Sequence, residues 1–188
     1  MRIFPALCLL LAGWSTLSLA AGTTNPPPAA ATNAHHQHVG VPSHPAPTNA
    51  LADARGAGFE VVDFDQLTGF TAALTLTPQG PEFQGRIPSE VLALSERRVA
   101  VAGMMMPLKL RDGQVSEFLL QKALAPCCQA QGPAINEWII VRMNSGGVTN
   151  VTHRPVVAAG KLIVGEYHEN GRLRAIYRME GEQLFDRE

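Results

Sequence analysis

Five strand-like runs between residues 98 and 179 constrain the fold of this chain more than any other feature. Each run is short and rich in β-branched and aliphatic residues, and turn-forming residues separate it from the next. The runs are Arg98 to Met105, Val115 to Gln121, Glu137 to Met143, Val156 to Tyr167 and Leu173 to Met179. This pattern predicts a mainly-β domain in which five strands form a small Greek-key barrel of the oligonucleotide/oligosaccharide-binding (OB) type. An open antiparallel sheet with a helix on one face is the alternative.

Local signals add detail to this prediction. Asn170-Gly171 separates the last two runs and is a strong signal for a tight hairpin. Gly103 and Gly160 predict a bulge or sharp coil within their strands. Pro88-Ser89-Glu90 predicts one short helix, from Val91 to Ser95. Further predictions are a short strand at residues 59–64 that leads into a loop, and a turn-rich loop at residues 77–88.

The N-terminus has the features of a signal peptide. Arg2 precedes an apolar stretch from Ile3 to Gly13, and Ser18-Leu19-Ala20 has the small-x-small form of a cleavage site. We therefore expect residues 1–20 to be removed and the mature chain to enter the periplasm. The apolar stretch is too short for a comfortable membrane span, although an uncleaved anchor is the alternative.

We expect residues 21–58 to form a disordered tether and residues 59–188 to form the β domain. The tether is rich in Pro, Ala, Thr, Asn and His, so it can bury little apolar surface to offset the entropy cost of ordering. It contains a histidine cluster, and neutral imidazoles bind Zn²⁺ or copper. The alternative is a solvated linker that merely contains histidine. The cluster consists of His35, His36, His38 and His44.

Charge and motifs exclude several classes of function. The formal net charge is −1, so the chain lacks the basic field that nucleic-acid binding requires. A serine-nucleophile motif, a glycine-rich phosphate loop and a C-x-x-C redox motif are all missing from the sequence. We therefore expect a protein that is not an enzyme.

Cys127 and Cys128 are adjacent, and the only other cysteine, Cys8, lies in the predicted signal peptide. A disulfide between neighbours closes no useful loop and fits ordinary disulfide geometry poorly, so a chemical role is favoured over an architectural one. The pair has three interpretations: thiolate ligands for Zn²⁺ or Cu(I), an easily reduced disulfide couple, or buried thiols that fill space. Metal binding is the interpretation that we favour.

Two thiolates are an incomplete zinc site, because zinc usually takes four ligands. His153, in a loop before a predicted strand, and His168, at the end of one, are candidates for the missing ligands. Met104, Met105 and Met106 are candidates for Cu(I), although packing is the commoner role of methionine. Strand alternation predicts that Met104 and Met106 share a face and that Met105 lies on the other.

Several motifs together resemble a known bacterial family. The segment from Val99 to Leu108, VAVAGMMMPL, is similar to the "v-x-G-[YF]-M-[LV]-P-L" segment of the family known as domain of unknown function 3299. Further similar segments are Glu117 to Leu120, Cys127-Cys128 with Pro133, Asn136 and Glu137, Gly160 to Gly165, and Tyr177 to Met179. Together they span about residues 59–182.

The resemblance implies an OB-like β-barrel that is exported to the bacterial envelope. It also implies an association with zinc-responsive genes and with components of ATP-binding-cassette transporters, but no established biochemical role. Many relatives resemble a "CIH-PPPP-NQ" pattern, whereas this chain has Cys127-Cys128-Gln129 and lacks that histidine. No metal ligand is therefore carried over at that position.

From these features the sequence predicts a metal-binding accessory of an envelope transport or metal-homeostasis system, with zinc or copper as the metal. A non-catalytic adaptor of an envelope transporter complex and a vicinal-dithiol redox protein are the alternatives.

Overall fold

The computed structural model describes residues 47–122, 133–144 and 146–186, which belong to one compact unit, Val39–Glu188. This part of the chain is mainly β, with few and short helices. Within it, every helix is too short or too polar to cross a membrane.

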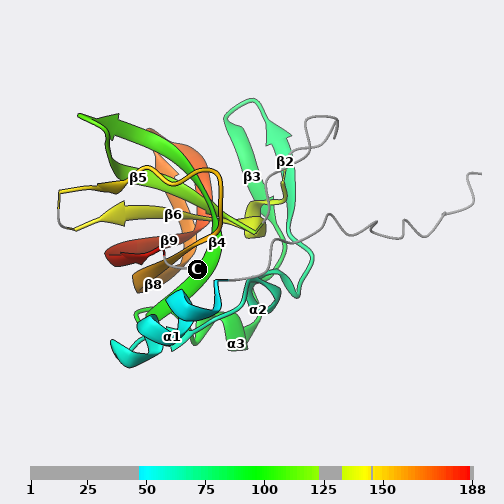
Figure 1. The fold of residues 1–188 in the computed structure, drawn as a ribbon. Helices are drawn as coiled ribbons and strands as arrows, with labels where there is room; N and C mark the ends of the chain where they lie inside the picture. The colour runs from blue at the N-terminus through cyan, green and yellow to red at the C-terminus, as the bar shows by residue number, and fades with distance from the viewer. Residues whose placement is uncertain (1–46, 123–132, 145, 187–188) are drawn as a thin grey trace, which may run out of the picture. The chain divides into compact units, whose positions relative to one another are not determined.

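Five long strands dominate the described residues, and each overlaps one of the five runs predicted from the sequence, although β4 and β9 extend well beyond the predicted ends (Figure 1). They pair in the order β4–β5–β6–β9–β8, and β8 pairs with β4 again. The β6–β9 pair is parallel and the other pairs are antiparallel. Two short strands, β1 (Glu60–Val61) and β7 (Val148–Thr149), pair with β4 and β5. The long strands are β4 (Arg98–Arg111), β5 (Gln114–Gln121), β6 (Trp138–Met143), β8 (Val156–Glu169) and β9 (Arg172–Phe185).

Strand β4 changes its pairing partner at Gly103. Residues 98–103 pair with β8, and pairing with β5 begins at Met104. A Cβ atom on Gly103 would lie 2.6 Å from the backbone oxygen of Gln121, so the close approach of the two strands requires glycine. At Gly160 the predicted irregularity is confirmed, because the register of β8 against β9 shifts between Ala159 and Gly160.

The predicted hairpin at Asn170-Gly171 is confirmed. Asn170 and Gly171 have φ values of 54° and 74° and connect β8 to β9. Asp112 and Gly113, which connect β4 to β5, have φ values of 52° and 77°. Positive φ at both central residues is the requirement of a type I′ turn, whose twist matches that of the flanking strands.

The segment before β4 is more structured than the sequence predicts. Helix α1 (Thr48–Gly56) lies within the range that the sequence assigns to the disordered tether, and its Ala50 and Ala54 are buried. These alanines pack with Phe59, Ala100, Val157 and Ala159, which explains why a segment of low hydrophobicity forms a helix here.

Three other predictions for this segment are wrong. The strand predicted at residues 59–64 is present as β1, but the loop expected after it is a helix, α2 (Phe64–Thr68), because Asp63 and Gln66 cap its start reciprocally. Residues 77–88 include most of a hairpin of β2 (Ala73–Thr77) and β3 (Gly80–Gln84). Three helices are present in the described part in place of the predicted one; the predicted helix is α3 (Ser89–Leu92). A short 3-10 helix, η1 (Ile135–Glu137), precedes β6.

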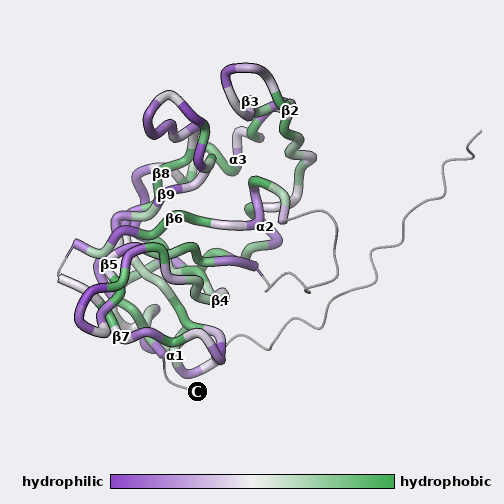
Figure 2. The backbone as a smooth tube through the Cα atoms, turned by 90° about the horizontal axis from the view of Figure 1, so that it is seen from above, coloured by the Kyte–Doolittle hydropathy of each residue, from purple (hydrophilic) through white to green (hydrophobic). Residues whose placement is uncertain are grey.

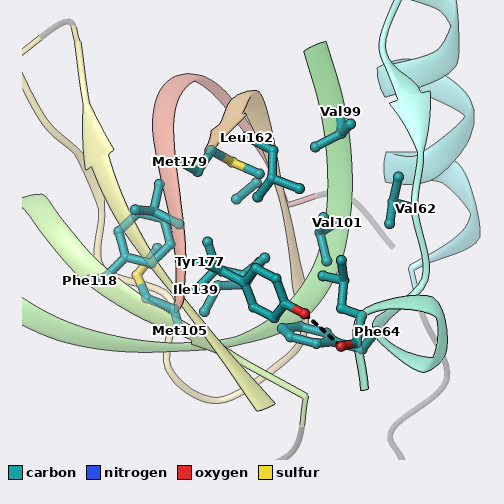
Figure 3. Close-up of a cluster of buried hydrophobic side chains, with 14 of the residues drawn as sticks. Val62, Phe64, Val99, Val101, Met105, Phe118, Ile139, Leu162, Tyr177 and Met179 are labelled. Atoms are coloured by element: carbon teal, nitrogen blue, oxygen red, sulfur yellow. Dashed lines mark hydrogen bonds between the residues drawn. The ribbon is translucent and has the colours of Figure 1, made fainter. Parts of the chain in front are cut away.

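The main core lies on the inner side of the five long strands, and α2 packs against it (Figure 3). Val101, Phe118, Ile139 and Tyr177 are completely buried there. The hydroxyl of Tyr177 donates a 2.7 Å hydrogen bond to the backbone oxygen of Leu67 in α2. Burial raises the pKa of the Tyr177 hydroxyl well above its ordinary value, so the group stays a neutral donor.

We expect Tyr177→Phe to lower the free energy of unfolding by about 1–2 kcal/mol, because the buried Leu67 carbonyl loses its hydrogen-bond donor. Urea denaturation at pH 7 measures this difference. An unchanged midpoint would show that this hydrogen bond contributes nothing to holding α2 on the core.

Gly103→Ala is expected to lower the free energy of unfolding by about 1–3 kcal/mol, because its methyl group would overlap the Gln121 backbone oxygen. Gly56→Ala is the matched control, since a Cβ at Gly56 meets nothing within 4 Å. Urea denaturation of both variants checks the comparison, and equal stability of the two would contradict it.

Candidate binding face

The structure describes two of the eight residues predicted as metal ligands. His153 is exposed in the loop before β8, and His168 is exposed near the end of β8. The Nε2 atom of His168 lies 3.7 Å from a carboxylate oxygen of Glu166. Within the described residues neither histidine joins a group of three or more metal-ligating side chains. The other six, which lie outside the described residues, are Cys127, Cys128, His35, His36, His38 and His44.

The methionine run follows the predicted alternation. Met105 lies in the core and is 1% exposed, whereas Met104 and Met106 lie outside that cluster. Met104 and Met106 differ in exposure, however, with 4% and 40% of their surfaces exposed. Met104 therefore has a packing environment, and only Met106 offers a freely accessible side chain.

A row of charged residues crosses the five long strands on the side that faces away from the core. The strand register places one charged residue on each strand in turn, and the sign of the charge alternates along the row. We call this set the charged row; it consists of Lys109, Glu117, Arg142, Glu180 and Lys161. Directly opposed residues of opposite charge stabilise neighbouring strands.

Glu117 is the most buried member of the charged row. It is 8% exposed, and one of its carboxylate oxygens accepts hydrogen bonds from Lys109 Nζ at 2.9 Å and from Arg142 Nε at 2.6 Å. Burial alone raises the pKa of the Glu117 carboxyl, but these two hydrogen bonds lower it more, and the pKa lies below its ordinary value. Glu117 is therefore a carboxylate at neutral pH that holds two cations in place.

A second row lies beside the charged row on the same outer side. On β5, β6, β9 and β8 its member is two positions away from the charged residue of the same strand. It is apolar except for one arginine, and register again places one residue on each strand. Met106 is 40% exposed, whereas Ile140 is only 3% exposed. We call this set the apolar row; it consists of Met106, Leu119, Ile140, Arg178 and Ile163.

Tyr167 joins the two rows near the hairpin between β8 and β9. Arg142 Nη2 donates hydrogen bonds of 2.8 Å to the Tyr167 hydroxyl and 3.1 Å to Glu169. The guanidinium carbons of Arg142 and Arg178 lie 5.4 Å and 4.6 Å from the centre of the Tyr167 ring. Arg174 Nε lies 3.8 Å from Glu169. The tips of the hairpins are hydrophilic, and the middles of the strands are hydrophobic (Figure 2).

The outer face, defined as both rows with Tyr167, Glu169 and Arg174, is suited to recognition. Burial lowers the pKa of Arg142, but Glu117 and Tyr167 raise it more, and the guanidinium stays charged throughout the neutral range. The face therefore offers ordered charges together with the exposed Met106 and the partly exposed Leu119 and Ile163. These are the components from which protein interfaces are built.

The sequence alone does not reveal this face, although it contains one signal for it. Glu117 and Arg142 each interrupt an otherwise largely apolar strand-like run. An ionisable residue inside such a run either faces solvent or has a partner. The partner lies on another strand, and only the register between the strands identifies it.

The class of protein is a mainly-β domain with a mixed charged and apolar face across its longest strands. The family described as protein of unknown function DUF3299 matches residues 82–186, and the chain belongs to this family. The resemblance inferred from the sequence motifs is thus confirmed.

A solved structure supports the fold. A crystal structure of a DUF3299 family protein from Pseudomonas aeruginosa is 20% identical in sequence and has a TM-score of 0.51. The similarity covers 69% of this chain and 97% of that chain. No curated protein matches this sequence.

We expect Glu117→Gln to lower the free energy of unfolding at pH 7 by about 1–3 kcal/mol, because Lys109 and Arg142 lose a charged acceptor. The folded-state pKa of Glu117 is lowered, so its contribution is complete above the unfolded pKa of about 4.3. The contribution is lost as the pH falls through the lower, folded-state pKa. Urea denaturation from pH 7 to pH 2 should therefore show the wild-type and variant stabilities converge in acid. A constant difference across this range would contradict this assignment.

Proposed function

We propose that the five long strands form an OB-like Greek-key barrel, and that the chain is a non-catalytic adaptor that binds a partner protein in the bacterial envelope. The strand pairings return to β4 after β8, and among the five long strands of the described residues the one parallel pair joins the third and the fifth. OB domains bind their ligands over the second and third strands, between the hairpins that join strands one to two and four to five. Glu117 and Arg142 lie on the second and third long strands, β5 and β6.

The observation that carries this proposal is the composition of the outer face. Its charged row alternates in sign, which suits a surface of mixed charge better than the uniformly negative backbone of a nucleic acid. Met106 and the neighbouring Leu108 add exposed apolar surface at one end, with 40% and 39% of their surfaces exposed. An apolar patch bordered by ordered charges is typical of a protein-binding site.

The place of action rests on the sequence. The predicted signal peptide favours the periplasm, and the resemblance to family members encoded beside transporter genes favours a component of an ATP-binding-cassette transporter as the partner. The adaptor would bind such a component without spanning the membrane itself after cleavage of the signal peptide.

Site-specific photo-crosslinking in intact Gram-negative cells that export the protein to the periplasm tests the adaptor function. A photoreactive residue at Met106 should yield one discrete crosslinked protein, because Met106 lies exposed on the proposed face. The same residue at Arg55, which is exposed on α1, is the control and should not yield that product. Equal crosslinking at both positions, or no crosslinked protein at Met106, would refute the adaptor function.

A metal-binding accessory is the second candidate, and adjacent Cys127 and Cys128 together with the four-histidine cluster of the predicted tether favour it. In this proposal the histidines capture Zn²⁺ or copper and the cysteine pair binds or senses it, with His153 and His168 as further ligands.

Native mass spectrometry of untagged protein tests the second candidate. A stoichiometric zinc or copper ion is expected, and its loss after Cys127→Ser with Cys128→Ser, or after His35, His36 and His38 are changed to Ala, would identify the ligands. A metal-free mass would contradict metal binding. If that mass were also lighter by two hydrogens, the dithiol redox alternative would be favoured.

A further inference from the structure

Arg178 is the exception in the apolar row. The register places it between Ile140 of β6 and Ile163 of β8, and its side chain is partly exposed. Glu180, two residues further along β9, contacts Lys161 at 3.1 Å. Within the described part of the chain, no carboxylate forms an ion pair with the Arg178 guanidinium.

The other basic side chains near Arg178 already have carboxylate partners. Arg142 contacts Glu117 and Glu169, and Arg174 lies 3.8 Å from Glu169. Arg178 therefore adds positive charge that the described carboxylates of this face leave unpaired. An anionic group on a ligand would supply the carboxylate partner that Arg178 lacks on this face.

Tyr167 fixes the position of the Arg178 guanidinium. The guanidinium carbon lies 4.6 Å from the centre of the Tyr167 ring, which is within the range of a cation–π contact. The Tyr167 hydroxyl is itself held by the 2.8 Å hydrogen bond from Arg142. A guanidinium held in this way loses little side-chain entropy when it binds a ligand.

We propose that Arg178 receives a carboxylate from the partner protein, and that an apolar group next to this carboxylate packs on the partly exposed Ile163 beside it. The inference rests on the proposed adaptor function and adds the chemistry that the face recognises: an acidic residue, or a chain terminus, flanked by an apolar residue. The planar guanidinium fork matches a carboxylate with two parallel hydrogen bonds. Glu180 lies two residues from Arg178 on β9, and Glu169 binds Arg142, whose guanidinium shares the Tyr167 ring with that of Arg178, so a singly charged carboxylate fits this site better than a doubly charged phosphate.

Small probes test this recognition directly by NMR titration of the full chain. The probe is hexanoate, which combines a carboxylate with an apolar chain, and hexanamide is its neutral match. Hexanoate should shift the Arg178 Nε–H signal and the backbone amide signal of Ile163 in a saturable manner. Hexanamide and acetate should each bind about tenfold more weakly, because each lacks one of the two contacts. Equal binding of hexanoate and hexanamide would refute the proposal.

Hexyl phosphate distinguishes a protein carboxylate from a phosphate group such as that of a lipid. Weaker binding of hexyl phosphate than of hexanoate is expected. Tighter binding of hexyl phosphate at Arg178 would overturn the assignment to a carboxylate and would favour a phosphate-bearing ligand.

Three variants locate the effect. Arg178→Met replaces the guanidinium with an apolar side chain and should abolish the difference in affinity between hexanoate and hexanamide. Arg55→Met, at an exposed position on α1, should preserve that difference. Arg178→Lys should weaken hexanoate binding several-fold, because it keeps the charge without the fork. Unchanged hexanoate binding by Arg178→Met, with its fold verified by circular dichroism, would contradict the proposal.

The crosslinking experiment separates this proposal from the adaptor function. Loss of the Met106 crosslink in the Arg178→Met variant would support both. Retention of the crosslink at full yield would refute the role of Arg178 while leaving the adaptor function supported. Absence of the crosslink in the wild type would refute the adaptor function itself.

Discussion

The close approach of β4 and β5 at Gly103 is the contact on which the rest of the arrangement depends. On one side of this residue β4 pairs with β8, and on the other side it pairs with β5. A side chain at Gly103 would meet the Gln121 backbone, so this change of partner requires glycine. Through it β4 joins both β8 and β5, and the five long strands return to the strand from which they start.

The register of the strands brings charged residues that are far apart in the sequence into one row on the surface. Lys109, Glu117, Arg142 and Lys161 come from four different strands, yet they lie in one row. Exposed ion pairs contribute little to stability, but Glu117 is mostly buried, and its position orders Lys109 and Arg142 around it. The geometry of the outer face thus depends on a carboxylate that is itself hardly accessible.

The strands could be predicted from the sequence because their signals are local. Alternating apolar residues and the Asn170-Gly171 turn depend only on neighbouring residues. The helix at residues 48–56 could not be predicted in the same way, because Ala50 and Ala54 are stabilised by Ala100, Val157 and Ala159 from distant strands. The outer face could not be predicted for the same reason, since the partners of Glu117 are 8 and 25 residues away in the chain. The interpretation of the cysteine pair stays a prediction, because Cys127 and Cys128 lie outside the described residues.

Helix α1 has a consequence for the direction from which another molecule approaches. It packs on the outward residues Ala100, Val157 and Ala159, where β4 and β8 meet (Figure 1). Small side chains at this seam let the helix lie close, so the chain covers this part of its own exterior. Arg142 and Arg178, on β6 and β9, are both partly exposed. Another molecule therefore meets helix α1 first where β4 and β8 join, whereas it can reach the side chains of Arg142 and Arg178 directly.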